Sequence, residues 1–520
     1  MSHHKPDPNK NVNLTINGLP VTVPEGTTIL EAARKINISI PTLCNFPGLG
    51  RRAVCRLCVV ECDGRGKLMA ACANDVYEGA KIVTSNQRLI GIRRTIIELL
   101  LNNHPQECLY CVKNKKCELQ SLAEMYGIRE MPFRRGARDS RPGINENGIL
   151  KRDMSKCIRC GRCVEVCQEV QTVRAINSAH RSFEYEICTP YGQALADGSC
   201  IFCCQCAAVC PVGAIYEFDE TANVLAALND AGNHTAAQVS PAAAPALDGE
   251  LDLPPGSVTR GQIVTALKLM GFKKVYDAAF FAEISVKELS REFQERLKNR
   301  GRQNEKGPGK LPMISGCSSA VRSFINKCYP DLLEHLPFNK TPEQIFRSLV
   351  QASGEEAQKV SSVSIVPCIT KKFESLRQDI NKDDSSFRDY TLSVQELAKM
   401  IKTAGIDFTD LPESPFDIFT HNAPEPSSVT SRADTEQILE KVYEGYFSEK
   451  PALALRGAQD QKGVKEAELD IDGTGVRVLA VNGLSNARPL LDAIRRGECN
   501  ADFIEIISCS IKAGCSKGIN

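Results

Sequence analysis

The chain has 520 residues, enough for three or four domains of about 150 residues, and 64 Lys and Arg residues balance 63 Asp and Glu. The net charge of +1 gives neither the basic surface typical of nucleic-acid binding nor a polybasic membrane signal, and no apolar run approaches the ~20 residues of a membrane span. The polar start, MSHHKPDPNK, has no apolar signal core, so we expect a cytoplasmic protein.

The 24 cysteines are the most informative feature of the composition. Most lie between residues 44 and 210 in C-x-x-C runs, a spacing that places thiolates around a metal or an iron–sulfur cluster. Disulfides rarely persist in the cytosol, and scattered apolar thiols would not gather in this way. We therefore expect an intracellular protein with several iron–sulfur clusters.

Residues 11–84 are predicted to form a β-grasp domain. VNLTI and LPVTV read as strands around an Asn-Gly turn, and Thr28 with Glu31 forms a capping box before the helical ILEAARKI. Four cysteines follow with the spacing C-x10-C-x2-C-x13-C: Cys44, Cys55, Cys58 and Cys72. They supply two thiolates to each iron of a [2Fe–2S] cluster. A four-cysteine zinc site is the alternative.

Residues 85–130 are predicted to form a second cluster domain. A helix at 85–102 leads into an H-x3-C-x2-C-x5-C run formed by His104, Cys108, Cys111 and Cys117. One imidazole and three thiolates can hold a [4Fe–4S] cluster, and the neutral imidazole should raise its reduction potential. An ordinary surface histidine is the alternative for His104.

Residues 145–220 carry the most specific signal, two runs of C-x2-C-x2-C-x3-C. In two-cluster ferredoxins the fourth cysteine of each run binds the other cluster. One [4Fe–4S] cluster is thus expected on Cys157, Cys160, Cys163 and Cys210, and the other on Cys200, Cys203, Cys206 and Cys167. Cys204 lies off this spacing and has no ligand role. We expect one [2Fe–2S] and three [4Fe–4S] clusters in all, and no catalytic residue among them.

Residues 236–520 alternate strand-like runs such as VSSVSIVP with helical runs such as SVQELAKMIKTAG, which predicts an α/β domain with a mostly parallel sheet. An Ala-rich stretch at 221–247 is interpreted as a linker to it. No G-x-G-x-x-G follows a strand and there is no Walker loop, so we expect no nucleotide site in this chain.

The order of these motifs resembles the large iron–sulfur subunit of NADH dehydrogenases and the catalytic subunit of [FeFe]-hydrogenases. The C-terminal half is similar to the hydrogenase domain in the segments GFKKVYDAAFFAEISVKE, LPMISGCSSAV, VPCITKKFE and VLAVNGLSNARPLL. The resemblance covers nearly the whole chain. It implies a multidomain α+β and α/β fold: a β-grasp [2Fe–2S] domain, a [4Fe–4S] domain with one His and three Cys ligands, a two-[4Fe–4S] ferredoxin domain and a hydrogenase-like α/β domain.

In that family a cubane is joined through a cysteine to a di-iron subsite, and three motifs supply the ligands. The first, T-S-C-C-P-x-W, is SGCSSAV here: Cys317 matches the proton-donating cysteine, but Ser318 replaces a cubane ligand. The family's Trp is Val321, and the chain contains no Trp. The second motif, M-P-C-x-x-K-x-x-E, is kept as VPCITKKFE. Cys368 holds its ligand position, and Lys371 matches the lysine that contacts the di-iron cyanide.

The third motif, A-C-P-G-G-C-x-x-G-G-G, is SCSIKAGCSKG here, which sets Cys509 and Cys515, the would-be bridging thiolate, two residues too far apart. The Gly-rich turn G-A-T-G-G-V aligns with SRADTE at 431–436, where charged side chains replace glycines. The proton-relay glutamate falls on Leu289, with Glu292 as a candidate for its distal partner, so proton delivery is broken. We therefore expect no di-iron subsite.

Four cysteines remain at or near these motifs: Cys317, Cys368, Cys509 and Cys515. Their number suits an additional, fourth [4Fe–4S] cluster if Cys317 replaces the missing ligand. Buried thiols in a relic domain are the alternative.

The resemblance implies an electron-transfer subunit of a flavin-based, electron-bifurcating NAD(P)H/ferredoxin oxidoreductase of the transhydrogenase type, without hydrogen activation. Its expected partners are an NAD(P)H- and flavin-binding subunit, a small thioredoxin-like [2Fe–2S] subunit and ferredoxin, with no nucleic acid and no membrane. An active [FeFe]-hydrogenase subunit is the alternative. A redox sensor or assembly scaffold is a third interpretation, although no sensory extension is evident in the sequence.

Overall fold

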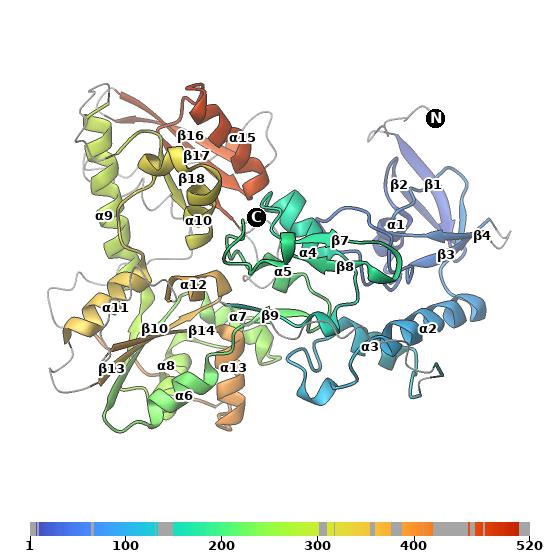
Figure 1. Ribbon diagram of the computed structural model, residues 1–520, viewed down its shortest axis with the longest axis horizontal. Coiled ribbons are helices and arrows are strands. Elements are labelled where there is room, and N and C mark those ends of the chain that lie inside the picture. The colour runs from blue at the N-terminus through green and yellow to red at the C-terminus, as the bar shows by residue number, and fades with distance from the viewer. Residues whose placement is uncertain are drawn as a thin grey trace. The chain divides into compact units, whose positions relative to one another are not determined.

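A computed structural model describes residues 7, 10–63, 67–130, 132–133, 149–300, 309–316, 318–353, 359–375, 387–408, 410–419, 456–457, 463–471 and 474–508. The chain divides into two compact units. The first contains residues 1–170, 174–198 and 205–216, and the second contains 171–173, 199–204 and 217–520 (Figure 1).

The first unit begins with a five-stranded sheet in the order β2-β1-β5-β3-β4. Its strands are β1 (Asn11–Ile16), β2 (Leu19–Pro24), β3 (Val59–Cys62), β4 (Lys67–Ala70) and β5 (Lys81–Val83). Asn17 and Gly18 both have positive φ, as a tight hairpin turn requires. Alternate residues of β1 are buried and join the core beneath helix α1 (Ile29–Lys35). The predicted order of strand, turn, strand and helix is confirmed.

The capping box at the start of α1 is also confirmed. Thr28 Oγ1 accepts the Glu31 N–H at 3.1 Å, and the Glu31 carboxylate accepts the Thr28 N–H at 2.9 Å. The exposed N–H groups of the first turn are thereby satisfied. The Leu30 N–H donates to the carbonyl of Ala71 at 3.0 Å, so this helix end also holds the chain that leads into Cys72.

The rest of the first unit is built from short elements. Helix α2 (Gln87–Asn102) matches the predicted helix. The further helices are α3 (Glu118–Met125), α4 (Arg162–Glu165) and α5 (Gln205–Ala208). Two small sheets pair β6 (Leu150–Arg152) with β9 (Ile215–Glu217) and β7 (Asn177–Ala179) with β8 (Glu186–Cys188).

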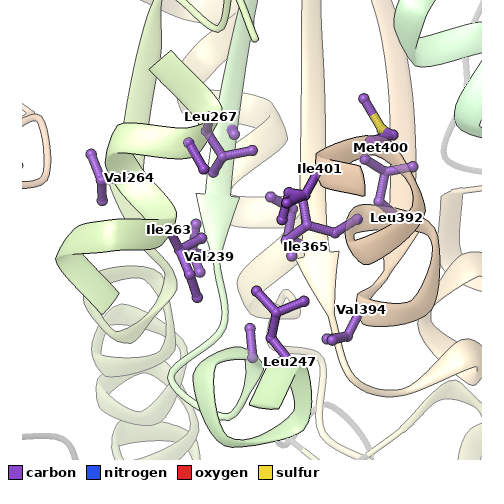
Figure 2. Packing of buried hydrophobic residues seen from close by; sticks show 14 of the residues in the cluster. Val239, Leu247, Ile263, Val264, Leu267, Ile365, Leu392, Val394, Met400 and Ile401 are labelled. Atoms are coloured by element: carbon purple, nitrogen blue, oxygen red, sulfur yellow. The ribbon is translucent and has the colours of Figure 1, made fainter. Parts of the chain in front are cut away.

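The second unit contains a parallel sheet in the order β11-β10-β13-β14. Its strands are β10 (Asn233–Val239), β11 (Lys274–Asp277), β13 (Lys359–Val366) and β14 (Phe387–Ser393). On one face lie α7 (Ala243–Glu250), α8 (Arg260–Leu269) and α13 (Val394–Thr403), whose apolar residues form one core with the sheet (Figure 2). On the other face, residues of α9 (Ala278–Lys298) and α11 (Pro342–Ser353) form a second core. The predicted parallel α/β arrangement is confirmed here.

A second sheet of this unit has the order β12-β18-β17-β16-β15. Its strands are β12 (Met313–Gly316), β15 (Arg456–Gly457), β16 (Val464–Ile471), β17 (Thr474–Asn482) and β18 (Phe503–Ile507). The pairs β12–β18 and β17–β18 are parallel, and the pairs β16–β17 and β15–β16 are antiparallel. The described residues of the unit also form α6 (Thr221–Asn229), α10 (Ser319–Cys328), α12 (Lys372–Ser375) and α15 (Leu484–Arg495).

The interpretation of residues 221–247 as a linker is wrong. This segment forms α6, β10 and the start of α7, and β10 pairs with β11 on one side and β13 on the other. The segment NHTAAQV has only one strongly apolar residue, Val239, whereas buried parallel strands are typically rich in them, so its composition hides its role.

Within the part of the chain that the structure describes, none of the helices combines the length and the apolar character needed to span a bilayer.

Candidate metal centres

The four cysteines of the β-grasp domain converge on one another. Cys58 directly precedes β3 and Cys72 follows β4, and their Sγ atoms are 3.3 Å apart. Cys44 contacts both Cys55 and Cys72 through side-chain hydrogen bonds. Three of the four residues are buried, Cys55 being half-buried. The segment 44–72, which contains β3 and β4, thus brings all four sulfurs together.

The hydrogen bonds between these sulfurs lower the pKa values of two of the thiols and raise those of the other two. Hydrogen bonds from Cys55 and Cys72 hold the pKa of the Cys44 thiol far below its usual range, and the backbone N–H groups of Cys55 and Val54 lower it further. A hydrogen bond with Cys72 lowers the pKa of Cys58 to about 7. The same hydrogen bonds raise the pKa values of Cys55 and Cys72.

This donor set fits a [2Fe–2S] cluster, because the sulfurs already contact one another and backbone N–H groups point at them. Within the described residues, no group of three or more His, Cys, Asp or Glu side chains has the arrangement that would hold a single metal ion.

The second expected site lies between α2 and α3. Cys108 begins a short 3-10 turn, the Cys111 N–H closes it on the carbonyl of Cys108 at 3.1 Å, and Cys117 directly precedes α3. Burial raises the pKa of Cys117, and the nearby Cys111 and Cys108 sulfurs add to the effect. The structure therefore places these three thiols close to one another, and the assignment of His104 as the fourth ligand stays a prediction.

The first ferredoxin-type set also comes together, including its distant fourth member. Burial raises the pKa of Cys160 to about 12, and the Cys210 and Cys157 sulfurs contribute. Burial likewise raises the pKa of Cys163 well above its usual range, with Cys160, Cys157 and Cys210 adding to it. Cys210 thus lies beside the first run, as the exchange of fourth cysteines between the runs requires. Because cluster ligands are thiolates, a cluster bound here would have to displace the protons that burial favours on these thiols.

In the second ferredoxin-type set, two of the cysteine sulfurs accept backbone hydrogen bonds. The Ala175 N–H donates to Cys167 Sγ at 3.2 Å, and the Phe202 N–H donates to Cys200 Sγ at 3.4 Å. Cys206 is buried on α5, and Thr370 Oγ1 donates to the carbonyl of Cys203 at 3.4 Å. Cys167 and Cys206 belong to the first unit and the other two to the second, and the grouping of these four as ligands stays a prediction.

Arg162 joins three of the cysteine-bearing segments of the first unit, and no sequence motif indicates this role. Its guanidinium donates to the Glu118 carboxylate at 2.6 and 2.9 Å, beside Cys117. It also donates to the carbonyls of Asn45, beside Cys44, at 2.9 Å and of Val209, beside Cys210, at 3.4 Å. Arg162 is 2 % exposed and itself precedes Cys163. One buried cation thus fixes the relative positions of these loops.

Gly213 provides a second link within this unit. A Cβ atom at this position would lie 2.7 Å from Cys111 Sγ, closer than such atoms approach, so the sulfur packs directly on the glycine backbone. The Glu118 N–H also donates to the carbonyl of Pro211 at 2.9 Å. The segment after Cys210 therefore contacts the loop that carries Cys111 and Cys117. The only sequence signal for this was a glycine three residues after a cysteine.

The hydrogenase-like motifs are described only in part. Cys317, Cys509, Cys515 and the segment 431–436 lie outside the described residues. Cys368 is half-buried after β13. Ser318 and Ser508 are buried with their hydroxyl oxygens 3.1 Å apart.

The side chains that align with the family's other functional positions contact neighbouring residues of this chain. Lys371 forms an ion pair with Glu343 on α11. Leu289 is 5 % exposed in a core with Phe293 and Met313. Glu292 accepts hydrogen bonds from Arg296 at 2.5 Å and from the Phe338 N–H at 2.9 Å.

Models of known families match most of the chain. The "Iron only hydrogenase large subunit, C-terminal domain" matches residues 233–518. The "2Fe-2S iron-sulfur cluster binding domain" matches 9–87, and the "NADH-ubiquinone oxidoreductase-G iron-sulfur binding region" matches 93–132. The "NADH-quinone oxidoreductase subunit 3, ferredoxin-like domain" matches 148–216.

Individual proteins are similar over the same range. The NADP-reducing hydrogenase subunit HndD of Solidesulfovibrio fructosivorans is 34 % identical over 98 % of this chain and 88 % of its own length. Iron hydrogenase 1 of Clostridium pasteurianum is 29 % identical over 97 % and 88 %. A solved [FeFe]-hydrogenase whose H cluster is degraded by oxygen matches with a TM-score of 0.51 and 26 % identity, over 58 % of this chain and 84 % of that one.

Proposed function

The chain belongs to the iron-only hydrogenase large-subunit family, and from that premise we propose that it is an electron-relay subunit that has lost hydrogen activation. The expected resemblance is confirmed, as is the presence of [2Fe–2S], ferredoxin-like and hydrogenase-like domains. The proposed complex is a flavin-based, electron-bifurcating NAD(P)H/ferredoxin oxidoreductase. In such a complex a flavin on a partner subunit would exchange electron pairs with NAD(P)H, and this chain would carry single electrons between that partner and ferredoxin.

The contacts among the cysteine-bearing loops support the relay. Bound iron–sulfur clusters supply one-electron steps at low potential. The residues of this chain set the positions of the loops: Arg162 ties three of them together, and Gly213 lets Cys111 pack on the backbone that follows Cys210. Arg162 and Gly213 are themselves buried, and such contacts suit the short separations that electron carriers require.

The main support for the loss of hydrogen activation is the serine at position 318. It stands at a position that the family resemblance assigns to a cubane-ligating cysteine, and its hydroxyl contacts that of Ser508. Two further contacts agree with it. Lys371, aligned with the lysine that contacts the di-iron cyanide, is ion-paired with Glu343, and Leu289 puts a hydrocarbon side chain where the proton relay needs a carboxylate.

The first experiment tests hydrogen chemistry directly. The anaerobically purified holo protein is matured with the di-iron precursor and then examined by infrared spectroscopy for CO and CN bands and by a hydrogen-uptake assay. We expect neither the bands nor uptake above background, while reduction by dithionite still bleaches the iron–sulfur absorption. Bands together with hydrogen uptake would identify the chain as an active hydrogenase subunit instead.

A further inference from the structure

Three carboxylates and one ammonium group lie together in the interior of the second unit. Lys372 is 2 % exposed, Glu396 5 % and Glu220 6 %, and the Glu217 side chain is 14 % exposed. Lys372 Nζ lies 2.6 Å from the Glu396 carboxylate and 3.2 Å from that of Glu217. The Glu220 N–H donates to Glu396 Oε1 at 2.7 Å, and the Glu220 carboxylate interacts with the charges of Lys372 and Glu396. Fully ionised, this carboxylate site would carry an excess of buried negative charge.

The hydrogen bonds of the carboxylate site favour a proton on Glu220. Lys372 donates to two carboxylates and to the carbonyl of Phe218 at 2.8 Å, which accounts for the three N–H bonds of its ammonium group. Glu220 instead accepts the Thr391 N–H at 2.8 Å. Burial raises the pKa of Glu220 to about 7. Because like charges cannot all be ionised at low cost in a buried site, one carboxylate holds a proton near neutral pH.

The other ionisable groups around Glu220 come from β14 and from the surface. Asp389 on β14 raises the pKa of Glu220 further, and Tyr390 beside it interacts with the Glu220 charge. Asp219, the residue before Glu220, is half-exposed and forms an ion pair with Lys399 on α13 at 2.7 Å. Glu220 thus lies one residue from an exposed ionisable pair, which gives protons a short route between the solvent and the carboxylate site.

The segment that carries Lys372 also contacts the loop that carries Cys203. Thr370, two residues before Lys372, donates its hydroxyl to the carbonyl of Cys203 at 3.4 Å. Phe373, the residue after Lys372, stacks on Phe202 with the ring centroids 4.5 Å apart. Thr370 and Phe202 are buried. Charges are screened weakly in such packing, so a charge added at Cys203 acts on the carboxylate site.

We infer that Glu220 is a redox-linked proton-binding site, which takes up a proton when the cluster expected at Cys203 is reduced. Glu220 receives the proton from solvent on a carboxylate oxygen, with formation of one O–H bond, as the cluster gains one electron from the relay. On reoxidation the electron returns to the relay and the proton to solvent. The net charge of this buried region therefore stays constant, which favours reduction. The inference rests on the proposed function for the presence of the cluster, and it adds a proton to one of the electron-transfer steps.

The test is a potentiometric titration of the holo protein with dithionite between pH 6 and 9, followed by electron paramagnetic resonance. The signal of interest is the one that Cys203→Ser changes. Glu220→Gln removes the titrating group and keeps an acceptor for the Thr391 N–H. The matched control is Glu283→Gln, at another buried carboxylate of the unit, which pairs with Lys287 on α9 at 2.9 Å. Infrared difference spectra of the reduced and oxidised parent protein, in water and in heavy water, report carboxyl protonation directly.

In the parent protein and in Glu283→Gln, we expect the reduction potential to be constant below about pH 7 and to fall above it. The limit is a tenfold change in the reduction equilibrium constant per pH unit, which corresponds to one proton per electron. Reduction above pH 7 should also produce the C=O band of a protonated carboxyl group, and Glu220→Gln should lack both the slope and the band.

Two results would overturn the inference and leave the proposed function intact: a potential that is independent of pH in the parent protein, or a slope and band that persist in Glu220→Gln. If Glu220→Gln fails to bind its clusters, the parent spectra still decide, because a missing carboxyl band contradicts proton uptake. The absence of any reducible cluster that depends on Cys203 would contradict both the inference and the relay.

Discussion

Arg162 shows how one side chain can organise sites whose ligands lie far apart in the sequence. Its guanidinium makes a two-point contact with Glu118 and reaches the carbonyls of Asn45 and Val209 from a buried position. Only a planar, forked donor meets these acceptors together, and a lysine ammonium cannot. The residue therefore supports three loops without being a ligand itself.

We predict that Arg162→Lys destabilises the loops locally by about 2–3 kcal/mol, because buried acceptors lose their donors. The measurement is the temperature at which the visible circular dichroism of the clusters is lost, together with the magnetic coupling between reduced clusters in electron paramagnetic resonance spectra. Arg94→Lys, at a half-exposed i,i+4 ion pair with Glu98, is the control and should change neither. An unchanged coupling signal in Arg162→Lys would exclude the positioning role.

At the scale of residues, the sequence predicted which cysteines lie together but not the side-chain contacts that position their loops. The cysteine spacings follow from ligand chemistry, and the structure brings together the thiols of the first, second and third sets. Arg162 was missed because its partners lie 44, 47 and 117 residues away. Local spacing carries no information about such contacts, and the same applies to the pairing of Lys371 with Glu343.

At the scale of elements, a buried charge network joins α12, β14, α13 and the end of β9. Lys372 on α12 is 2 % exposed and forms ion pairs with Glu396 at 2.6 Å and with Glu217 at 3.2 Å. Glu220 receives the Thr391 N–H on its carboxylate at 2.8 Å. Burial raises the pKa of Glu220 to about 7, an effect only partly offset by the Thr391 N–H and Lys372.

This raised pKa predicts a pH dependence with a definite sign. The folded state keeps a proton on Glu220 that the unfolded chain releases near pH 4.5, so local stability is highest at low pH and falls as the pH rises towards 7. The loss is on the order of 2–3 kcal/mol. Amide hydrogen exchange in α13 and β14, corrected for intrinsic rates, should show it between pH 5 and 8.

Glu220→Gln should flatten this dependence, because the amide oxygen still accepts the Thr391 N–H and carries no charge. Asp252→Asn is the control, since its side chain is 91 % exposed, and it should keep the slope of the parent protein. Equal slopes in Glu220→Gln and the parent would contradict the assignment.

Elements with local signals were predicted, and elements defined by their neighbours were not. The Asn-Gly hairpin and the Thr28 capping box depend on residues within a few positions of each other, and both are present. Strand β10 was read as part of a linker because its alanines, threonine and glutamine resemble a surface segment. It is a strand because β11 and β13 satisfy its backbone on both edges and helices cover it.

At the scale of the whole molecule, the expected cluster content can be counted. One [2Fe–2S] and three [4Fe–4S] clusters contain about 14 irons and 14 sulfides. We predict this content in the anaerobically reconstituted full chain, and the same content in Cys368→Ser. About 18 irons, falling to about 14 in Cys368→Ser, would instead demonstrate a further cluster in the hydrogenase-like domain. Cys111→Ser serves as the positive control, with an expected loss of about four irons.

The close packing of Cys111 on Gly213 also has a consequence for biogenesis. The backbone from Cys210 to Gly213 borders two expected clusters at once, because it carries a ligand of one and supports a ligand loop of the other. Each cluster site is therefore fully formed only when the loop of the neighbouring site has folded. We therefore expect the two positions to mature together, so that loading one of them shapes the other.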